Sequence, residues 1–373
     1  MKQRYHFIDN LRWVVVLLVL LYHVFYNYNS LGIFGAIGGP EGSRGADIVM
    51  YPIYPWFMVL LFALAGASSR YALRGRTTKE FRRERTRKLL IPSTIGLLIF
   101  GWVLGLLNTH IATASGNLPV DDLPLLVRYI IWVASGTGPL WFLQDLFLYS
   151  LLLLPARRIV SAEQVDEWLS KRSEGTLWAL LALIAPLLWG VAQSQIDNPT
   201  AAQGLLNLYR PVFYFAPFLV GYYLLSSERI HDLLRKGAWW LVGAAAVCAT
   251  GFTAHRFGQD YTAPEVVQSP DYNLFAWVAT LALVGLFGRT ADTTGPFAEY
   301  MRRSSFGLYV VHMTVCTAVC YWLQGCGLSV VATYALAIVG TFGGSVALYE
   351  VLHRIPIVRR YLFGIVPRPS VKE

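Results

Sequence analysis

Charged residues are scarce in this sequence, and their scarcity argues against an ordinary soluble protein. Asp, Glu, Lys and Arg make up 14% of the 373 residues, whereas 55% are hydrophobic. A soluble domain has about 25% charged residues. The composition therefore predicts an integral membrane protein with an all-α fold, a polytopic bundle of transmembrane helices.

Cysteine is also rare, and its spacing does not support a metal site. The sequence has four cysteines. Cys316 and Cys320 are one helical turn apart, but no histidine or carboxylate at a matching spacing completes a set of ligands. We predict no metal, and we assign the thiols to packing among apolar side chains.

A cleavage site and long polar segments are missing as well. The apolar run from Trp13 to Phe25 follows basic residues, as in a signal peptide, but no Ala-x-Ala site comes after it. We therefore expect a retained helix. Because no repeat, linker or polar domain interrupts the chain, residues 1–373 are predicted to form a single membrane domain.

Apolar stretches near the ~20 residues that cross a bilayer recur along the chain. We expect about ten spans, at 11–28, 54–72, 89–107, 139–155, 176–193, 211–226, 238–254, 272–288, 305–323 and 328–352. With a cytoplasmic N-terminus, 27 of the 31 Lys and Arg residues lie on the inner side, as the positive-inside bias favours. Both termini are then cytoplasmic, and the expected location is the cell membrane, in bacteria the inner or plasma membrane.

A shorter apolar piece, Leu125 to Ala134, is the weakest candidate for a span. An eleventh span there would invert all later loops and leave 14 basic residues inside against 15 outside. We therefore expect an interfacial or re-entrant segment, which is tolerated at membrane depth where protein or a water-filled cavity covers it.

The net charge of +9 does not indicate a nucleic-acid partner. The basic residues belong to inner loops, where membrane lipids with anionic headgroups account for most of them. One of these loops begins with Ser161-Ala162-Glu163-Gln164, a capping-box pattern that predicts a short cytoplasmic helix through Lys171.

Polar residues form one stripe on the first span. At 100° per residue, five positions fall within about 60° of one another: Asp9, Arg12, Val16, His23 and Asn27. An ionisable group at this depth costs ~2.5–3.5 kcal/mol on insertion scales, so His23 is expected to face a cavity or a partner. We interpret His23 as a proton-transfer histidine; the alternative is a neutral imidazole hydrogen-bonded inside the bundle. For Asp9 and Arg12 we favour orientation of the histidine, while an i, i+3 ion pair or ligand contact stays open.

Basic residues are concentrated between the second and third spans. Residues 70–88 hold seven arginines and two lysines, opposed only by Glu80 and Glu84. The positive-inside bias alone accounts for such a run. Guanidinium groups, however, also bind phosphate oxygens bidentately, so we expect a polyphosphate cosubstrate to dock here.

Several segments together carry a family resemblance. They are Arg4-x4-Asp9-x2-Arg12 with the following run to Tyr22-His23, Trp56-Phe57 through Ala65-Gly66, FRRERTRKLLIP at 81–92, PLWFL at 139–143, SFGLYVVH at 305–312, and the tail from Arg354-Ile355-Pro356 to Leu362-Phe363-Gly364. In this order they resemble the acyltransferase-3 family of integral membrane acyltransferases, and the tail is similar to that of the branch containing glucan succinyltransferases.

The resemblance implies an enzyme that moves an acyl group, such as acetyl or succinyl, from cytoplasmic acyl-CoA to a hydroxyl at the outer face. The implied donor is above all acetyl-CoA, and the implied acceptor is a glycan, a glycolipid or another molecule of the cell envelope. In this sequence His23 would be the catalytic residue, with Asp9 and Arg12 as its supporting pair. Many members have Ser-Gly where this chain has Ala65-Gly66, so a serine relay at that position is excluded.

For the donor, the resemblance assigns Arg82 and Arg85 as the acyl-CoA contacts. The loop has more than one register of basic residues, so Arg83, Arg87 and Lys88 are equal candidates for the phosphates.

Other polar groups at membrane depth are further candidates. Asp145 follows an apolar stretch with no basic neighbour, so it is either part of the catalytic or substrate site or hydrogen-bonded between helices with Gln144. Trp141, close to it, is a candidate for stacking on a sugar, although interface belts explain most aromatic residues.

The late span adds a second histidine. His312 and Tyr309 are candidates for the substrate site, or they hydrogen-bond within the bundle. Glu350 either has a role in the site or pairs with Arg354 one turn later.

Two hypotheses from other classes remain. A transporter or flippase of a lipid-linked saccharide or small metabolite also needs buried charges, but such proteins often show repeated halves, which we do not see here. A catalytically silent membrane partner predicts that replacing His23 has no biochemical effect.

Overall fold

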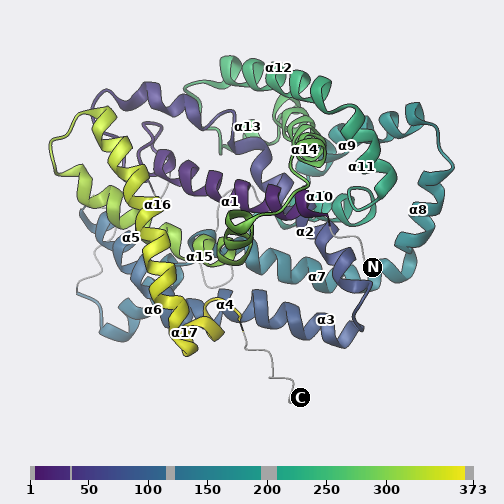
Figure 1. The fold of residues 1–373 in the computed structure, drawn as a ribbon. Helices are drawn as coiled ribbons and strands as arrows, with labels where there is room; N and C mark the ends of the chain where they lie inside the picture. The colour runs from purple at the N-terminus through teal and green to yellow at the C-terminus, as the bar shows by residue number, and fades with distance from the viewer. Residues whose placement is uncertain (1–4, 34–35, 115–121, 195–207, 366–373) are drawn as a thin grey trace.

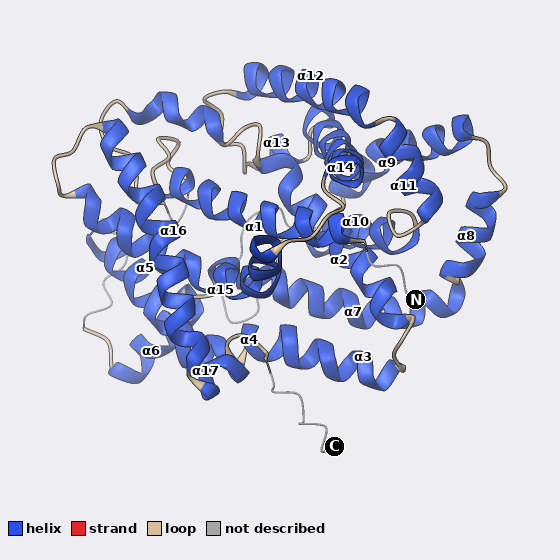
Figure 2. Ribbon diagram, viewed as in Figure 1, coloured by secondary structure: helices blue, strands red, loops and turns tan. Residues whose placement is uncertain are grey.

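The structure, a computed structural model, describes residues 5–33, 36–114, 122–194 and 208–365. Lys2, Arg4 and the tail from residue 366 lie outside these ranges. In the described residues all regular elements are helices, and none is a strand (Figure 2). In chain order they are α1 (His6–Asn27), η1 (Ser43–Val49), α2 (Tyr54–Leu73), α3 (Thr78–Arg85), η2 (Thr86–Leu90), α4 (Ile91–Ser93), η3 (Leu97–Gly101), α5 (Trp102–Ala114), α6 (Leu125–Ser135), η4 (Gly138–Leu140), α7 (Trp141–Ile159), α8 (Ala162–Ser170), α9 (Glu174–Ala192), α10 (Pro211–Tyr223), α11 (Glu228–Lys236), α12 (Ala238–Arg256), α13 (Pro264–Val267), α14 (Pro270–Thr290), α15 (Pro296–Gln324), α16 (Val330–Arg354) and α17 (Pro356–Tyr361).

Eight helical segments in the described part of the chain are long and apolar enough to cross a membrane. They coincide with eight of the ten expected spans. The expected span at 238–254 corresponds to α12, which makes a 73° bend with α11 and counts as a ninth only if the pair forms one broken span. The span expected at 211–226 corresponds to the 13 residues of α10. The all-α membrane bundle is therefore confirmed, while the number ten and the side of each terminus stay predictions.

Helix α1 runs through the middle of the bundle (Figure 1, purple) and packs against α2, α14, α15 and α16. Its 22 residues contain no glycine or proline, and apolar side chains on several sides make it hydrophobic nearly all round. Phe7, Leu11, Val15 and Val19 are buried to 1% exposure or less. A central helix of this kind brings its polar residues into contact with other helices rather than lipid.

Helices α2 and α10 approach each other at two glycines. A Cβ on Gly66 would lie 1.9 Å from the carbonyl oxygen of Phe218, and one on Gly221 would lie 1.9 Å from that of Ala63. Small residues at both crossing points let the two backbones touch, as in membrane helix pairs. The Gly66 of the family-like Ala-Gly pair therefore has a packing role.

Helix α6 folds back along α5. A Cβ on Gly105 would lie 1.5 Å from the carbonyl oxygen of Trp132, and one on Gly136 would lie 2.0 Å from that of Gly101. The two helices are thus antiparallel and in backbone contact. With 11 residues, α6 is too short to cross a bilayer. This length agrees with the prediction that Leu125 to Ala134 is not a span.

Two short helices between the long apolar ones begin at capping boxes. Ser161 and Gln164 cap α8 reciprocally, and Lys171 is its C-cap, as the sequence predicts. Thr77 and Glu80 do the same for α3, the helix that carries the basic run. Phe81 of α3 is fully buried, which fixes the face that this helix turns toward the bundle.

Candidate active site

Two histidines from opposite ends of the chain meet between α1 and α15. Nδ1 of His23 lies 3.2 Å from Nε2 of His312, and the ring centroids are 4.9 Å apart. His312 is fully buried, whereas His23 keeps partial exposure. Each ring also has a backbone partner on its own helix: His23 Nδ1 lies 2.7 Å from the carbonyl oxygen of Val19, and His312 Nδ1 lies 2.6 Å from that of Tyr309.

Aromatic rings from α1 and α2 lie next to His23 and to one another. Tyr22 and Tyr26 place their ring centroids 5.2 Å and 6.1 Å from the imidazole. The Tyr22 ring stacks on Tyr54 at 5.9 Å, and the hydroxyls of Tyr54 and Tyr209 lie 3.2 Å apart. Tyr209 in turn contacts Trp141, at a centroid distance of 5.2 Å. A continuous aromatic cluster thus connects His23 with the predicted sugar-stacking residue.

Arg12 lies near the other end of α1. Its Nη1 is 3.3 Å from the Asp9 carboxylate, so the i, i+3 ion pair that the sequence left open as an alternative is present. Its Nη2 donates to the hydroxyl of Ser68 near the end of α2. His23 lies eleven positions after Arg12, about 16 Å along the helix axis. The structure therefore does not bring Arg12 into contact with the histidine.

Arg85 reaches the same end of α2. Its Nη2 donates to the hydroxyl of Ser69 at 3.2 Å, and its guanidinium covers the Phe81 ring at 4.7 Å. Glu84 acts on it as an opposite charge, and Arg12 and Arg76 act on it as like charges. Two guanidinium groups are thus held on neighbouring serines.

The other predicted donor contacts point elsewhere. Arg82 and Arg83 are exposed, and Lys88 pairs with Glu84 at 2.7 Å. The Arg87 side chain is half-buried, and its Nε has no hydrogen-bond partner among the described residues. Of the five candidates, Arg85 is the one for which the structure records a contact with the end of α2 that Arg12 also reaches.

The remaining candidates, Asp145, Tyr309 and Glu350, form hydrogen bonds or lie beside residues on other helices. Asp145 is fully buried, and the side-chain amide of Gln144 beside it donates to the carbonyl oxygen of Ser93 at 3.0 Å. The hydroxyl of Tyr309 donates to the carbonyl oxygen of Pro139. Glu350 accepts a hydrogen bond of 2.9 Å from the hydroxyl of Tyr300.

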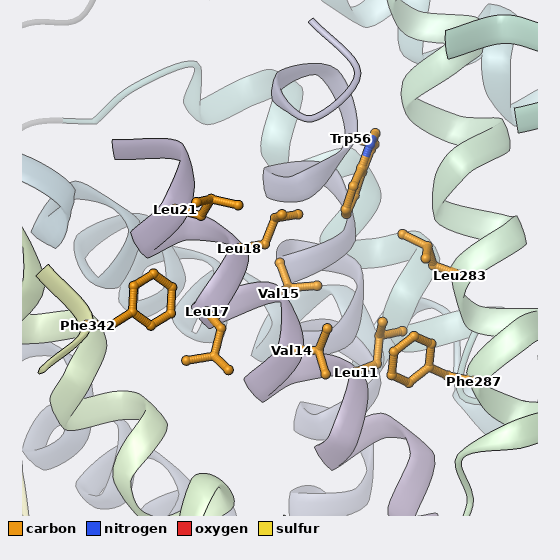
Figure 3. A pocket seen from close by; sticks show the side chains of 10 residues that line it. All are labelled: Leu11, Val14, Val15, Leu17, Leu18, Leu21, Trp56, Leu283, Phe287 and Phe342. Atoms are coloured by element: carbon orange, nitrogen blue, oxygen red, sulfur yellow. The ribbon is translucent and has the colours of Figure 1, made fainter. Parts of the chain in front are cut away.

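An apolar groove of about 250 Å³ lies on the other side of α1 (Figure 3). Six of its side chains come from α1, and Trp56, Leu283, Phe287 and Phe342 complete it from α2, α14 and α16. The Trp56 indole N–H is already bonded to the carbonyl oxygen of Pro52. The groove therefore offers no acid, base or charge for acyl transfer.

Metal-ligating residues do not cluster in the described ranges: no group of three His, Cys, Asp or Glu side chains there has the geometry to hold an ion. The sulfurs of Cys316 and Cys320 are 4.0 Å apart, and the Cys316 sulfur accepts from the side-chain amide of Asn27 at 3.3 Å.

Sequence reasoning named both histidines but not their contact, and it missed Ser68 and Ser69. A signal for the serines was present, since two adjacent hydroxyls precede Arg70 at the end of an apolar helix. No comparable local signal joins His23 to His312, because 288 residues separate them in the chain.

The apolar helices and the polar groups held between them define an integral membrane protein with a polar interior. A family model described as an acyltransferase domain matches residues 5–350. The chain belongs to the acyltransferase-3 family, and it is therefore a multi-pass membrane acyltransferase. Searches of curated proteins and of solved structures find no match.

Proposed function

We propose that the protein transfers an acyl group from acyl-CoA, bound at the Arg12 end of α1, to a hydroxyl group presented beside His23. The observation that carries this proposal is that one helix holds both parts. Arg12 lies with Arg85 on two adjacent serines, and His23 farther along the same helix contacts a second histidine.

The donor class follows from the charges. Two guanidinium groups brought close together repel each other, and an anion between them removes that repulsion. Planar guanidinium forks match phosphate oxygens better than any other side chain does. Because about 16 Å of helix separates Arg12 from His23, the donor must carry its phosphates and its reactive carbonyl at opposite ends of a long arm. Acyl-CoA has this form.

The chemistry at His23 balances without a metal or a further cosubstrate. The imidazole takes the proton from the acceptor hydroxyl while the oxygen attacks the thioester carbonyl. The carbon–sulfur bond then breaks, and the thiolate of CoA receives the proton from the imidazolium. The products are an ester and free CoA. General-base assistance of this kind contributes ~10²–10⁴ in rate.

The acceptor is proposed to be carbohydrate, as a glycan or glycolipid at the outer face. In the predicted orientation His23 lies about 6 Å from the outer end of α1. The partly exposed rings of Tyr26 and Trp141 offer apolar faces for stacking, and their polar tips serve hydrogen bonding. The acyl group is expected to be acetyl or succinyl. The transporter alternative is not proposed, because the family is one of acyltransferases.

The test uses the full chain in nanodiscs with radiolabelled acetyl-CoA and a mixture of neutral oligosaccharides. We expect label to appear in ester form, and we expect CoA affinity to fall when Arg12 and Arg85 are both replaced by Gln. The matched control replaces the exposed Arg82 and Arg83 by Gln, which removes the same charge. Equal loss of affinity in both double variants would contradict the proposal, because it would show that these arginines act only through their net charge.

A further inference from the structure

The hydrogen bonds around the two histidines determine which ring nitrogens carry protons. A backbone carbonyl oxygen only accepts hydrogen bonds. Nδ1 of His23 lies 2.7 Å from the carbonyl oxygen of Val19, and Nδ1 of His312 lies 2.6 Å from that of Tyr309. Both Nδ1 atoms must therefore carry hydrogen, and in the neutral rings both Nε2 atoms carry lone pairs.

The contact between the rings agrees with this assignment and shows which ring donates the hydrogen bond. Nε2 of His312, an acceptor, lies 3.2 Å from Nδ1 of His23, a donor. The His23 N–H is thus shared between the Val19 oxygen and His312. His312 has no N–H to offer in return, because its own is directed to Tyr309.

We infer that His312 is a positioning residue, which holds His23 in the tautomer whose Nε2 is the base and accepts a hydrogen bond from the imidazolium that forms. This inference rests on the proposed acyl transfer for its catalytic part, whereas the tautomer itself does not depend on it. When Nε2 of His23 takes the acceptor's proton, the ring becomes positive, and its Nδ1–H bond to His312 becomes charge-assisted. A base oriented by a third group in this way is the general logic of catalytic triads.

The same contact gives His312 a role other than the predicted one in substrate binding. His312 is fully buried, and its two ring nitrogens face Tyr309 and His23. Both of its polar atoms are thereby engaged within the bundle, whereas His23 is the partner that keeps exposure.

Three substitutions separate positioning from packing. In His312→Gln the side-chain amide reaches the place of Nε2, so its oxygen replaces the acceptor for His23. In His312→Asn the shorter amide reaches only the place of Nδ1, so the bond to Tyr309 is kept and the acceptor is lost. His312→Leu removes both. Cys316→Ala, one turn farther along α15 in the same buried interface, is the control for packing.

The assay measures acetyl-CoA turnover with the oligosaccharide mixture, together with CoA affinity. We expect His312→Asn and His312→Leu to lower kcat about 10- to 100-fold at unchanged CoA affinity. His312→Gln should recover most of kcat, and Cys316→Ala should resemble the wild type. Equal loss in Gln, Asn and Leu, or full activity in all three, would overturn the inference.

A measurement without substrate tests the tautomer assignment separately from the proposed acyl transfer. Nitrogen-15 NMR of the histidine-labelled protein, assigned with His23→Ala and His312→Gln, reads which ring nitrogens are protonated. We expect hydrogen on Nδ1 of both rings, and hydrogen on Nε2 of His23 would contradict the inference. If the NMR result holds but no oligosaccharide is acylated by the wild type, the proposed function fails and the tautomer assignment stands.

Discussion

The two faces of α1 differ in almost every physical property. One face carries Asp9, Arg12 and His23. Arg12 pairs with Asp9 and bonds to Ser68 of α2, and His23 contacts His312 of α15. The opposite face carries Leu11, Leu18 and their neighbours in the apolar groove (Figure 3). Both faces lie at membrane depth, so depth alone does not decide which residues are tolerated. What decides is whether another helix supplies a polar partner.

The comparison predicts its largest effect at His23. His23→Ala removes the proposed base and should lower turnover of acetyl-CoA by ~10²–10⁴. Leu18→Ala makes a similar truncation on the opposite face and should leave kcat near that of the wild type. Steady-state kinetics in nanodiscs measures both, and equal losses would mean that any disturbance of α1 inactivates the enzyme.

A charge placed on the apolar face should lower the yield of folded protein, for a reason unrelated to catalysis. In Leu18→Asp the carboxylate faces the groove, whose lining offers no polar partner. The expected cost is ~2.5–3.5 kcal/mol at membrane depth. The measurement is the yield of folded protein in membranes, with Leu18→Met as the control. Normal yield and activity of Leu18→Asp would show that the groove is not in contact with hydrocarbon.

The Arg12 end of the polar face should show a smaller effect, confined to binding of the proposed donor. Arg12→Gln removes one charged contact to the phosphate of the proposed donor. Such bonds contribute about 1.5 kcal/mol at the low end of their range, which is appropriate for a guanidinium that is 38% exposed. CoA affinity should therefore fall about tenfold while kcat changes little. Equilibrium binding of CoA checks this, with Arg83→Gln as the exposed control; a fall in kcat at full CoA affinity would instead favour the predicted support of His23.

The smallest effect is expected from enlarging the groove. Leu17→Ala removes part of a half-buried side chain that borders the groove and packs against the cluster around Leu308. We expect a change in unfolding free energy of less than about 2 kcal/mol and no change in kcat. Thermal unfolding in detergent together with kinetics tests this, and a large loss of kcat would connect the groove to the reaction.

The sequence allowed the bundle and the stripe on α1 to be predicted, because both depend on local periodicity. Long apolar runs predict helices in a membrane, and the 100° rotation per residue places Asp9, Arg12 and His23 on one side. The Asp9–Arg12 pair and the capped helix α8 follow from contacts three residues apart, and the structure confirms both.

Helical periodicity could also have indicated which arginine of α3 faces the bundle. Phe81 is the first apolar residue of a polar helix, so it sets the inward face of α3. Arg85 follows four residues later on that face, whereas Arg82 and Arg83 are turned about 100° and 200° away. Treating the loop as an unstructured run of charge hid this distinction.

The contact between His23 and His312 could not be predicted from local sequence patterns. It depends on how α1 packs against α15, and a single sequence contains no record of that packing. The meeting of Arg12 with Arg85 is of the same kind, because the end of α2 places Ser68 and Ser69 between two segments that are distant in sequence.

The most direct test of the account compares acyl transfer and donor binding in His23→Ala. We expect wild-type affinity for CoA, because the donor phosphates are assigned to Arg12 and Arg85 at the other end of α1. We also expect formation of labelled ester from acetyl-CoA to fall at least ~10²-fold. Ester formation at the wild-type rate in this variant would contradict the central claim that His23 is the base.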